Sequence, residues 1–448
     1  MSTYHPPRRL IDSFSGIQIL DRIPLPAIVA IALLLRFIAF FGSERPLTGD
    51  AIQYDHLGWS LAQGLGLRGL SGEPTAHFPP GYPIFLAAIY SLCGHEIVAV
   101  RLIQLALGVA TCLIWYQIVN QLLSKRDATL VALMLAIYPA MIYAQESLYT
   151  EQLFLFLFAI ATRLFITATI SPSLPLSFGV GVIFAWGLYV RPAVALFPGL
   201  VIAWGLVQQK AVRLTAVKHL TAFSLGGLLI AIPWLIRNER QFHAWIPLST
   251  HSGITFYSSY FPPKGYILGL LADDETVNIA NRLPTEVERD RFLMSQTIRR
   301  LIDNPHHLIP ASILKVTYLL SPIDWEVINY SRPSGFNWLY LCCFPFFLVG
   351  LCRRKNRRWD LPWSVVTVVP ILYLVFISLL YYGSPRMRLA FEPSFFLLAA
   401  IGLRDKSAFS TNHQRLLLIG YQCLLVGSLF FESSLKSSLK ILVSNIGY

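Results

Sequence analysis

Residues 148–170 read LYTEQLFLFLFAIATRLFITATI, and this stretch decides the fold class. Every residue from Leu153 to Ala161 is apolar, and as a helix the stretch is long enough to cross roughly 30 Å of hydrocarbon. Residues 23–41 and 361–382 form two more stretches of this kind. Because a soluble fold would have to bury all of them, the sequence predicts an all-α, polytopic membrane protein.

The composition agrees with a membrane protein. Of the 448 residues, 55% are hydrophobic and 13% are charged, whereas soluble domains carry about 25% charged residues. A net charge of +12 would suit nucleic acid, but the Lys and Arg residues gather between apolar runs, as the positive-inside rule requires, so we expect no nucleic-acid partner. The six cysteines lie mostly in apolar runs without metal-ligand spacing, so we expect neither disulfides nor zinc.

Apolar length and flanking charge together predict about eleven membrane-spanning helices. The expected spans are 23–41, 96–121, 128–144, 148–169, 175–190, 192–208, 219–236, 336–352, 361–382, 390–403 and 414–432. With a cytoplasmic N-terminus, crossing parity places the basic clusters inside, including Arg8 and Arg9, residues 353–358, and Lys406 with Arg415. The sequence therefore indicates an integral protein of the plasma or inner membrane.

The same parity places two long segments outside the cytoplasm. The first is the loop 42–95, and the second is the polar stretch 237–335, whose acidic and basic residues are balanced as on a folded surface. We therefore expect an N-terminal transmembrane module (1–236), an extracytoplasmic cap (237–335) and C-terminal transmembrane helices (336–448).

The first outer loop contains a candidate catalytic acid, Asp50. Apolar residues at 52, 57, 61 and 65 follow helical spacing, which predicts an amphipathic helix that starts just after Asp50 and lies on the membrane. A carboxylate held there suits general base catalysis on a hydroxyl or amine. The alternative is that Asp50 caps the helix. His77 lies just before two prolines, and its position favours a hydrogen-bonding loop residue over a catalytic base.

Two further acids lie in the short outer turn before residue 153. Glu146 and Glu151 precede a wholly apolar run, and an acid at that depth is unfavourable unless it has a partner or a function. The alternative for Glu151 is that it starts the helix, where negative charge suits the helix dipole.

Several arginines lie near the outer face, where the positive-inside rule does not explain them. They are Arg36, Arg191, Arg237, Arg386 and Arg388. The planar guanidinium matches phosphate oxygens, so these residues are candidates for binding a lipid phosphate. Snorkelling towards the headgroups is the alternative for each of them.

These residues resemble the GT-C class of membrane glycosyltransferases, in particular the family 39 or protein O-mannosyltransferase-like group, and they are also similar to the lipid A aminoarabinose transferases. The resemblance extends from about residue 25 to residue 403 and rests on the order of several short motifs. They are Gly49-Asp50, the run from His77 to Pro83, the run from Arg101 to Gln104, Leu148 to Glu151 after Tyr138-Pro139, Arg191-Pro192, Pro233 to Asn238 leading to Pro247 to Gly253, and Pro385 to Arg388 with Phe391 to Pro393.

The resemblance implies a sugar donor on a polyprenyl phosphate and transfer outside the cytoplasm by direct displacement with inversion. It implies that Asp50 is the acceptor ligand or general base and that Glu151 is the second acid of the reaction centre. Many relatives carry Asp at that second position, so Glu146 is a candidate to share its role. The arginines would receive the donor phosphate.

The resemblance also leaves several features open. Asp55, His77 and Tyr82 are its implied substrate-binding residues, and the acceptor can be a lipid, a glycan or a protein. The sequence predicts no metal site and no cofactor, and it leaves a divalent cation open.

The main alternative function is a polytopic transporter or lipid flippase, and a noncatalytic membrane subunit is a third. Transporters place their charged residues near the bilayer midplane, often within internal repeats, whereas the acids here gather in outer loops and at the ends of spans. This distribution favours the glycosyltransferase.

Overall fold

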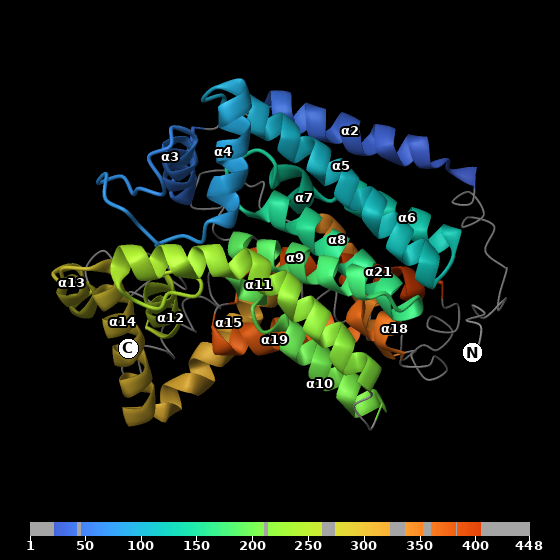
Figure 1. Cartoon of the computed structure of the whole chain (residues 1–448). Coiled ribbons are helices and arrows are strands. Elements are labelled where there is room, and N and C mark those ends of the chain that lie inside the picture. The colour runs from blue at the N-terminus through green and yellow to red at the C-terminus, as the bar shows by residue number, and fades with distance from the viewer. Residues whose placement is uncertain are drawn as a thin grey trace. The chain divides into compact units, whose positions relative to one another are not determined.

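The regular structure of the chain is helical. The computed structural model describes residues 22–42, 46–209, 214–261, 274–322, 337–352, 360–381 and 383–404. Within these ranges the regular elements are all helices, apart from one isolated bridge between Arg68 and Pro74 (Figure 1). The predicted all-α class is confirmed. The expected span 414–432 and the basic clusters at 353–358 and 406–415 lie outside the described residues.

The chain forms two compact units. Unit 1 comprises Met1–Leu248, Lys355–Tyr373 and Leu389–Ala400, and unit 2 comprises Ser249–Arg354, Leu374–Arg388 and Ile401–Tyr448. Most of the stretch 237–335 therefore belongs to unit 2, whereas the helices after residue 336 are divided between the units.

Among the described residues, five apolar helical stretches are long enough to cross a membrane. They are α2 (Leu25–Gly42), α5 (Ile97–Leu122), α8 (Glu151–Ile170), α11 (Leu214–Phe242), and α18 (Leu361–Val365) with α19 (Val368–Leu380). Shorter apolar helices are α4 (Gly81–Cys93), α9 (Leu174–Val190), η1 (Pro192–Val194) with α10 (Phe197–Gln209), and α17 (Trp338–Cys352). The last described helix, α21, is Glu392–Leu403.

The structure corrects one expected span. Residues 128–144 do not form a single helix, because α6 (Lys125–Ile137) ends before Tyr138 and α7 (Pro139–Tyr143) begins after it. Tyr138 has extended backbone angles (φ −72°, ψ 113°). The break lies where proline is expected to cause it, since Pro139 has no N–H to donate and disfavours helical angles in the residue before it.

The N-terminal part of unit 1 is a bundle of α2, α5 and α6, which lie side by side (Figure 1). Its core contains several alanines among larger apolar side chains, and such small residues let helices approach closely in a membrane. The buried core residues are Ile28, Ala32, Leu105, Val109, Ala132 and Ala136.

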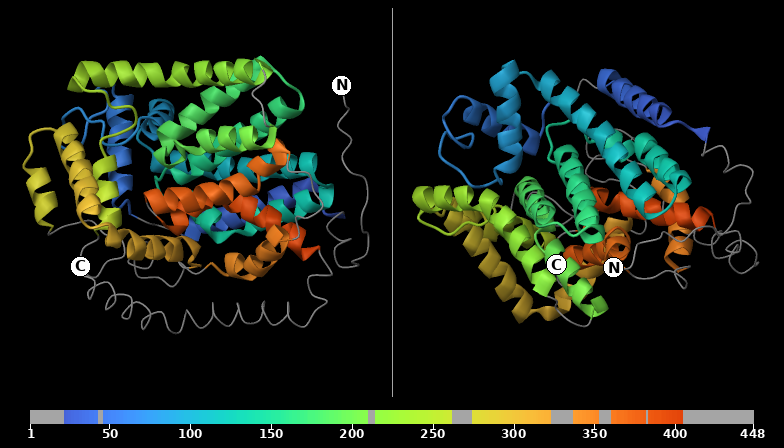
Figure 2. Two further views of the ribbon diagram at one scale, coloured as in Figure 1. Left: turned by 90° about the horizontal axis from the view of Figure 1, so that it is seen from below. Right: turned by 45° about the vertical axis from the view of Figure 1, so that its right-hand side comes forward.

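The rest of unit 1 extends this bundle. Helix α8 packs on α5 and on α9, and α9 packs along α11, as the three views in Figures 1 and 2 show. The first outer loop folds as two packed helices, α3 (Asp50–Ala62) and α4. The sequence predicted the first of these helices, which begins at Asp50, and that helix is confirmed.

Unit 2 contains a small helical assembly with its own core. Its helices are α12 (Ser252–Tyr260), α13 (Glu275–Asn281), α14 (Glu286–Asp303), η2 (Pro305–His307), α15 (Leu308–Leu320) and α20 (Pro385–Arg388). Tyr257 is fully buried in this core, and its hydroxyl accepts a hydrogen bond from Arg300 (2.7 Å) and donates to Asp274 (3.1 Å). Burial raises the pKa of Tyr257, so the phenol stays protonated and can donate.

Candidate functional site

Asp50 is the first residue of α3. Gly49 precedes it at the N-cap position with φ 56°, in the left-handed region that favours glycine. Asp50 therefore does not occupy the cap, which was the alternative that the sequence left open. Asp50 is partly exposed and lies in the first turn, where the helix dipole stabilises negative charge.

Tyr149 joins the start of α3 to the turn that contains the other acids. Its hydroxyl donates a hydrogen bond to the carbonyl of Thr48, over 3.3 Å. Thr48 lies two residues before Asp50, and Tyr149 lies two residues before Glu151. The contact therefore holds the N-terminal ends of α3 and α8, each of which begins with an acid, next to each other.

Glu151 is buried, with 6% of its surface exposed, and it begins α8. Its Oε1 lies 2.9 Å from Nη1 of Arg191. Arg191 is the C-cap residue of α9, just before Pro192. The acid is thus at a helix N-terminus and the arginine at a helix C-terminus, and both dipoles favour this arrangement. Two residues that the sequence singled out separately form one ion pair.

A chain of buried hydrogen bonds fixes the turn between α7 and α8. The Tyr82 hydroxyl donates to Oε1 of Gln104 (2.8 Å). Nε2 of Gln104 donates to the carbonyls of Gln145 (3.0 Å) and Ser147 (3.1 Å), and Nε2 of Gln145 donates to the carbonyl of Arg36 (2.9 Å). This network spans α2, α4 and α5, so the backbone that leads to Glu151 is rigid.

Tyr82, an expected substrate-binding residue, is completely buried at the start of α4. With 13 residues, α4 is shorter than the span-length helices, and we treat it as juxtamembrane. Burial, with smaller contributions from Tyr90 and Glu151, raises the pKa of Tyr82 well above its usual value. Its hydroxyl therefore stays protonated and is committed to Gln104, which makes Tyr82 a residue that positions the turn.

Glu146 lies in that turn and is 2% exposed. Its backbone N–H donates to the carbonyl of Tyr143 (3.1 Å). The structure therefore buries both acids of the segment.

Asp55, expected to bind substrate, is on α3 and faces α4. Its Oδ1 accepts a hydrogen bond from the Tyr90 hydroxyl and lies 2.9 Å from Nε2 of His95. The His95 ring stacks on Trp59, with centroids 4.7 Å apart. Burial and the Asp55 carboxylate both raise the pKa of Tyr90. These contacts assign Asp55 to the packing of α3 against α4.

His77 is partly exposed in the loop ahead of α4. Its backbone N–H donates to Oγ1 of Thr75 (3.0 Å), and its ring meets the Phe78 ring edge to face, with centroids 4.8 Å apart. These are the contacts of a structured loop, in line with the loop alternative that the sequence left open.

Arg36 is completely buried, in contrast to the expected position near the outer face. Its Nη1 donates to the carbonyls of Ala32 (3.3 Å) and Ala136 (3.2 Å), and its Nη2 lies 3.8 Å from the sulfur of Cys112. The guanidinium is therefore inside the bundle of α2, α5 and α6. It joins these helices, and a phosphate could not reach it without parting them.

Arg237 is partly buried on α11. Its Nη1 donates to Oδ1 of Asn238 (2.9 Å) and its Nη2 to the carbonyl of Leu67 (3.3 Å) in the first outer loop. The guanidinium also lies 5.1 Å from the ring centroids of both Trp234 and Phe242. Arg237 thus holds the outer loop against α11.

The other two candidate arginines belong to unit 2. Arg388 is 5% exposed and donates through Nη1 to the carbonyls of Leu319 (2.6 Å) and Ser321 (3.0 Å). Its guanidinium lies 3.7 Å from the centroid of Tyr340. Arg386 is partly exposed on α20. Arg388 therefore satisfies carbonyls at the end of α15, and Arg386 is the more accessible of the two.

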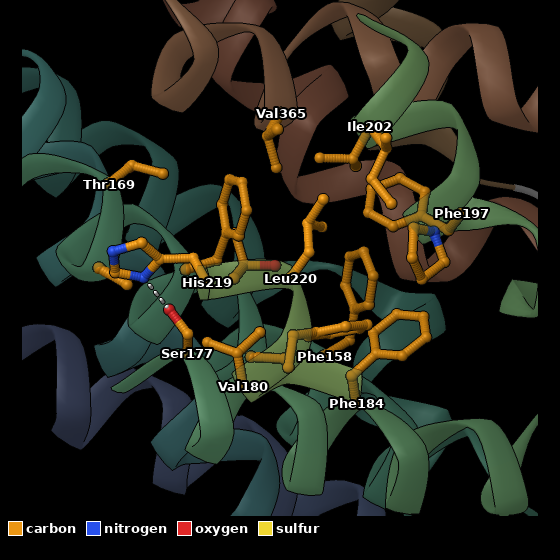
Figure 3. Close-up of a pocket in the computed structure, with 17 residues that line it drawn as sticks. Phe158, Thr169, Ser177, Val180, Phe184, Phe197, Ile202, His219, Leu220 and Val365 are labelled. Atoms are coloured by element: carbon orange, nitrogen blue, oxygen red, sulfur yellow. Dashed lines mark hydrogen bonds between the residues drawn. The ribbon is translucent and has the colours of Figure 1, made fainter. Parts of the chain in front are cut away.

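A cavity of about 160 Å³ lies elsewhere in unit 1, among α8, α9, α10, α11 and α18 (Figure 3). Its lining is mostly aromatic and aliphatic, and none of the predicted site residues takes part. Oγ of Ser177 and Nδ1 of His219 are hydrogen-bonded at one side (2.7 Å). A lining of this kind suits hydrocarbon better than a sugar or a phosphate.

Metal ligands do not cluster in the described ranges. Within them, no group of three or more His, Cys, Asp or Glu side chains is arranged to hold a metal ion.

Sequence reasoning gave no role to the polar residues that support the acids, although Gln104 and Tyr149 lie in motifs that carry the resemblance. Gln104 and Gln145 are buried, and Tyr149 makes the contact between the two helix ends. The signal for Gln104 was present, because a neutral amide in an apolar helix is unfavourable unless it is hydrogen-bonded. Tyr149 gave no such signal, since tyrosine is common at membrane interfaces.

Comparison with known proteins supports the resemblance. Residues 77–236 match the family described as dolichyl-phosphate-mannose-protein mannosyltransferase. This range includes Tyr82, Glu146, Glu151 and Arg191, but it ends before Arg237 and begins after Asp50. No curated protein matches the chain in sequence.

The fold is similar to solved structures of membrane glycosyltransferases. The archaeal oligosaccharyltransferase AglB from Archaeoglobus fulgidus, in complex with an inhibitory peptide and a dolichol-phosphate, matches with a TM-score of 0.52 and 13% identity, over 95% of this chain and 54% of that one. ArnT from Cupriavidus metallidurans, bound to undecaprenyl phosphate, matches with a TM-score of 0.45 and 15% identity, over 88% of this chain and 78% of that one.

The chain thus spans about half the length of AglB, and at this level of identity the likeness is one of fold. The predicted resemblance to the GT-C glycosyltransferases is confirmed. The apolar helices, together with this fold, make the chain an integral membrane protein.

Proposed function

We propose that this membrane protein, whose fold is that of the GT-C glycosyltransferases, transfers a sugar from a polyprenyl phosphate to an acceptor on the extracytoplasmic side of the membrane. Asp50 would be the general base or the ligand of the acceptor, and Glu151 the second acid of the reaction centre. The transferred sugar would be a hexose or a pentose, and the acceptor a lipid, a glycan or a protein.

One observation carries this proposal: the hydrogen bond between Tyr149 and Thr48. It holds together the two segments that begin with Asp50 and Glu151, although about a hundred residues separate them in sequence. A reaction that needs one acid to receive a proton and a second to orient charged groups requires such a meeting of distant segments.

The reaction follows from these roles as a direct displacement. The acceptor hydroxyl or amine gives its proton to the Asp50 carboxylate, and its oxygen or nitrogen forms a bond to the anomeric carbon. The bond between that carbon and the phosphate oxygen breaks, and the polyprenyl phosphate leaves with the electron pair. Attack opposite the leaving group inverts the anomeric configuration.

The donor class is supported by the comparisons. The matched family is described by a dolichyl-phosphate sugar, and the AglB structure contains a dolichol-phosphate. The Glu151–Arg191 pair contributes a guanidinium beside the acids, and an approaching phosphate could share it. Sugar transfer does not require the apolar cavity among α8, α9, α10, α11 and α18.

The test is a transfer assay with Asp50→Asn. The purified protein is supplied with polyprenyl-phosphate sugars and a membrane-lipid or cell-envelope extract, and the glycosylated product and the released polyprenyl phosphate are measured. We expect both to fall by about 100-fold or more in Asp50→Asn, as for the loss of a positioned general base. The anomeric configuration of the product, determined by NMR, should be inverted.

Glu73→Gln is the matched control, because Glu73 is an exposed acid in the same outer loop. It should transfer sugar at the wild-type rate, and both variants should unfold at the wild-type temperature. Wild-type transfer by Asp50→Asn would remove this residue from the reaction. Movement of the intact donor across a vesicle membrane without glycosidic cleavage would instead support the flippase alternative.

A further inference from the structure

The apolar cavity of unit 1 has no part in the proposed reaction. It lies among α8, α9, α10, α11 and α18, and its volume is about 160 Å³ (Figure 3). A cavity of about 150 Å³ with an aliphatic and aromatic lining is large enough to hold one benzene molecule. The cavity in unit 1 therefore has room for a short piece of hydrocarbon, and it is too small for a whole lipid.

The lining of the cavity has an apolar side and a polar side. Figure 3 shows Phe158 and Phe184 on one side, and Ser177 and His219 on the other. Oγ of Ser177 lies 2.7 Å from Nδ1 of His219, whereas Nε2 of this ring has no hydrogen-bond partner among the described residues. Nε2 donates if Nδ1 accepts, and it accepts if Nδ1 donates, so in either case it is left to bind a polar group.

The polar side of the cavity lies far from the proposed reaction site. Thr169 is 18 residues beyond Glu151 on α8, and Ser177 is 14 residues before Arg191, at the start of α9. At a rise of about 1.5 Å per residue, these separations are about 27 Å and about 21 Å along the helices. Since α8 is long enough to cross the membrane, Ser177 and His219 belong to the leaflet opposite Glu151.

The cavity opens laterally, between α10 and α11. Ile202 on α10 and Leu220 on α11 both contribute to the lining, and their exposed fractions are 37% and 36%. Residues that line a cavity and are also exposed lie at its mouth. In a membrane protein such apolar residues face lipid, so a lipid chain can enter here without passing through water.

The direction of the cavity matches the direction of a lipid in that leaflet. Its polar side is at the end of α8 where Thr169 lies, and Phe158 is 11 residues nearer the middle of the membrane. A phospholipid has its headgroup at the surface and its chain ends at the midplane in the same way. The exposed residue before His219 is Lys218, and a lysine at this depth attracts an anionic headgroup.

We propose that this cavity binds one acyl chain of an anionic phospholipid from the leaflet opposite Glu151. The end of the chain packs on Phe158 and Phe184, the headgroup bonds to Nε2 of His219 beside Lys218, and the rest of the lipid stays in the bilayer. The lipid thereby joins α10 to α9 and α11. This inference does not depend on the sugar-transfer reaction.

The test is photo-crosslinking with phosphatidylglycerol that carries a diazirine near the end of one acyl chain. The full-length wild-type protein is stripped of lipid in detergent, incubated with the probe and irradiated, and the modified residues are located by peptide mass spectrometry. We expect labelling of cavity-lining residues that saturates and that unlabelled phosphatidylglycerol removes. Labelling of Leu34 and Ile38, which are exposed on α2, should keep rising with probe concentration. Unsaturable labelling at both places would overturn the proposal.

Ala161→Phe tests whether the cavity itself holds the chain, because Ala161 is a buried lining residue of α8. The added ring fills the cavity, so saturable labelling should weaken by about tenfold or more as several methylene groups lose their site. Ala106→Phe adds the same ring at an exposed position of α5, and this control should be labelled as the wild type is. Wild-type affinity in Ala161→Phe would place the chain outside the cavity.

His219→Leu tests the position of the headgroup. It keeps the cavity apolar and removes Nε2, so affinity for the phosphatidylglycerol probe should fall by about fivefold, as for the loss of one hydrogen bond. Affinity for a diazirine-bearing alkane, which has no headgroup, should stay the same. An unchanged affinity for the phospholipid probe would remove His219 from the site.

Competition identifies the class of ligand. At equal concentration, unlabelled phosphatidylglycerol should displace the probe better than palmitic acid or farnesyl phosphate does. Better displacement by palmitic acid would assign the cavity to a free fatty acid, and better displacement by farnesyl phosphate would assign it to a prenyl chain. Either result overturns the proposal and leaves sugar transfer by Asp50 untouched, since none of these measurements involves transfer.

Discussion

Unit 1 and unit 2 each bury charged side chains, but they treat them differently. In unit 1, Glu151 is paired with Arg191 at 2.9 Å, and the turn before it is held by Gln104. In unit 2, the buried Lys315 of α15 has the Tyr260 ring beside it and no hydrogen-bond acceptor among the described residues. The difference predicts opposite effects on stability: a paired buried charge is fixed in position, whereas a buried charge without a hydrogen-bond acceptor destabilises the fold.

Breaking the ion pair between Glu151 and Arg191 gives the largest expected effect on stability. Arg191→Met leaves the Glu151 carboxylate buried without its cation, and we expect a loss of about 3–5 kcal/mol in the free energy of unfolding. The double variant Arg191→Met with Glu151→Gln should recover most of that loss, because no buried charge remains unpaired. Equilibrium unfolding in mixed micelles measures both.

Arg299→Met is the control for this pair. Arg299 lies 3.9 Å from Asp303 on α14, and their side chains are 77% and 61% exposed. An exposed pair contributes about 1 kcal/mol at most. If Arg191→Met cost no more than Arg299→Met, the pair in unit 1 would not be the fixed, buried charge that the comparison assumes.

Lys315→Met should change stability in the opposite direction. Burial lowers the pKa of Lys315 to about 7 in the folded protein, against 10.5 in the unfolded chain, so the unfolded chain binds the extra proton. The lysine therefore destabilises the protein fully below pH 7, and this effect disappears as the pH rises towards 10.5. We expect Lys315→Met to gain about 2–4 kcal/mol at pH 6.5 and almost nothing at pH 10.5.

Unfolding curves of both proteins at several pH values check this prediction. A gain in stability at pH 6.5 that disappears by pH 10.5 would identify the buried amine of Lys315 as the source of the destabilisation. A loss of stability at pH 6.5 would show instead that the contact with Tyr260 is structural.

Tyr82→Phe should have a smaller effect. It removes the hydroxyl that donates to Gln104, and the change leaves a buried amide oxygen without that donor. We expect a loss of about 1–2 kcal/mol in unfolding free energy and a modest fall in transfer, because the turn before Glu151 loosens. Gln104→Leu, which removes the amide at the centre of the network, serves as the comparison, and a larger activity loss in Tyr82→Phe would assign its hydroxyl directly to the substrate.

Much of the fold could be predicted because lipid imposes simple rules on sequence. Apolar length alone located α2, α5 and α8, and helical spacing located α3. The expected span 128–144 was wrong as a single helix, because the apolar run continues through Pro139 although the backbone does not. Hydropathy reports the solvent that surrounds a segment, whereas the break depends on the geometry of one residue.

The site was less predictable, because sequence identifies charged residues but not their partners. Glu151 and Arg191 were both selected, yet only packing of α8 on α9 shows that they pair. Arg36 was expected near the outer face, and its burial depends on which side of α2 meets α5 and α6. Lys315 was overlooked because the balanced charge of residues 237–335 hid one lysine in an apolar helix.

The smallest structural change tests the contact on which the catalytic proposal depends. Tyr149→Phe removes the partly buried hydrogen bond to Thr48, so unfolding free energy should fall by only about 0.5–1 kcal/mol. Transfer should fall much more than stability, by roughly tenfold, because small displacements of reacting groups greatly reduce rates. The loss should appear in kcat rather than in the KM for the donor, since Arg191 is untouched. Tyr143→Phe, at an exposed tyrosine of the preceding helix, should leave kcat unchanged. Equal kcat values for the two variants would mean that the ends of α3 and α8 do not work together, and Asp50 and Glu151 would then have to be assigned separate roles.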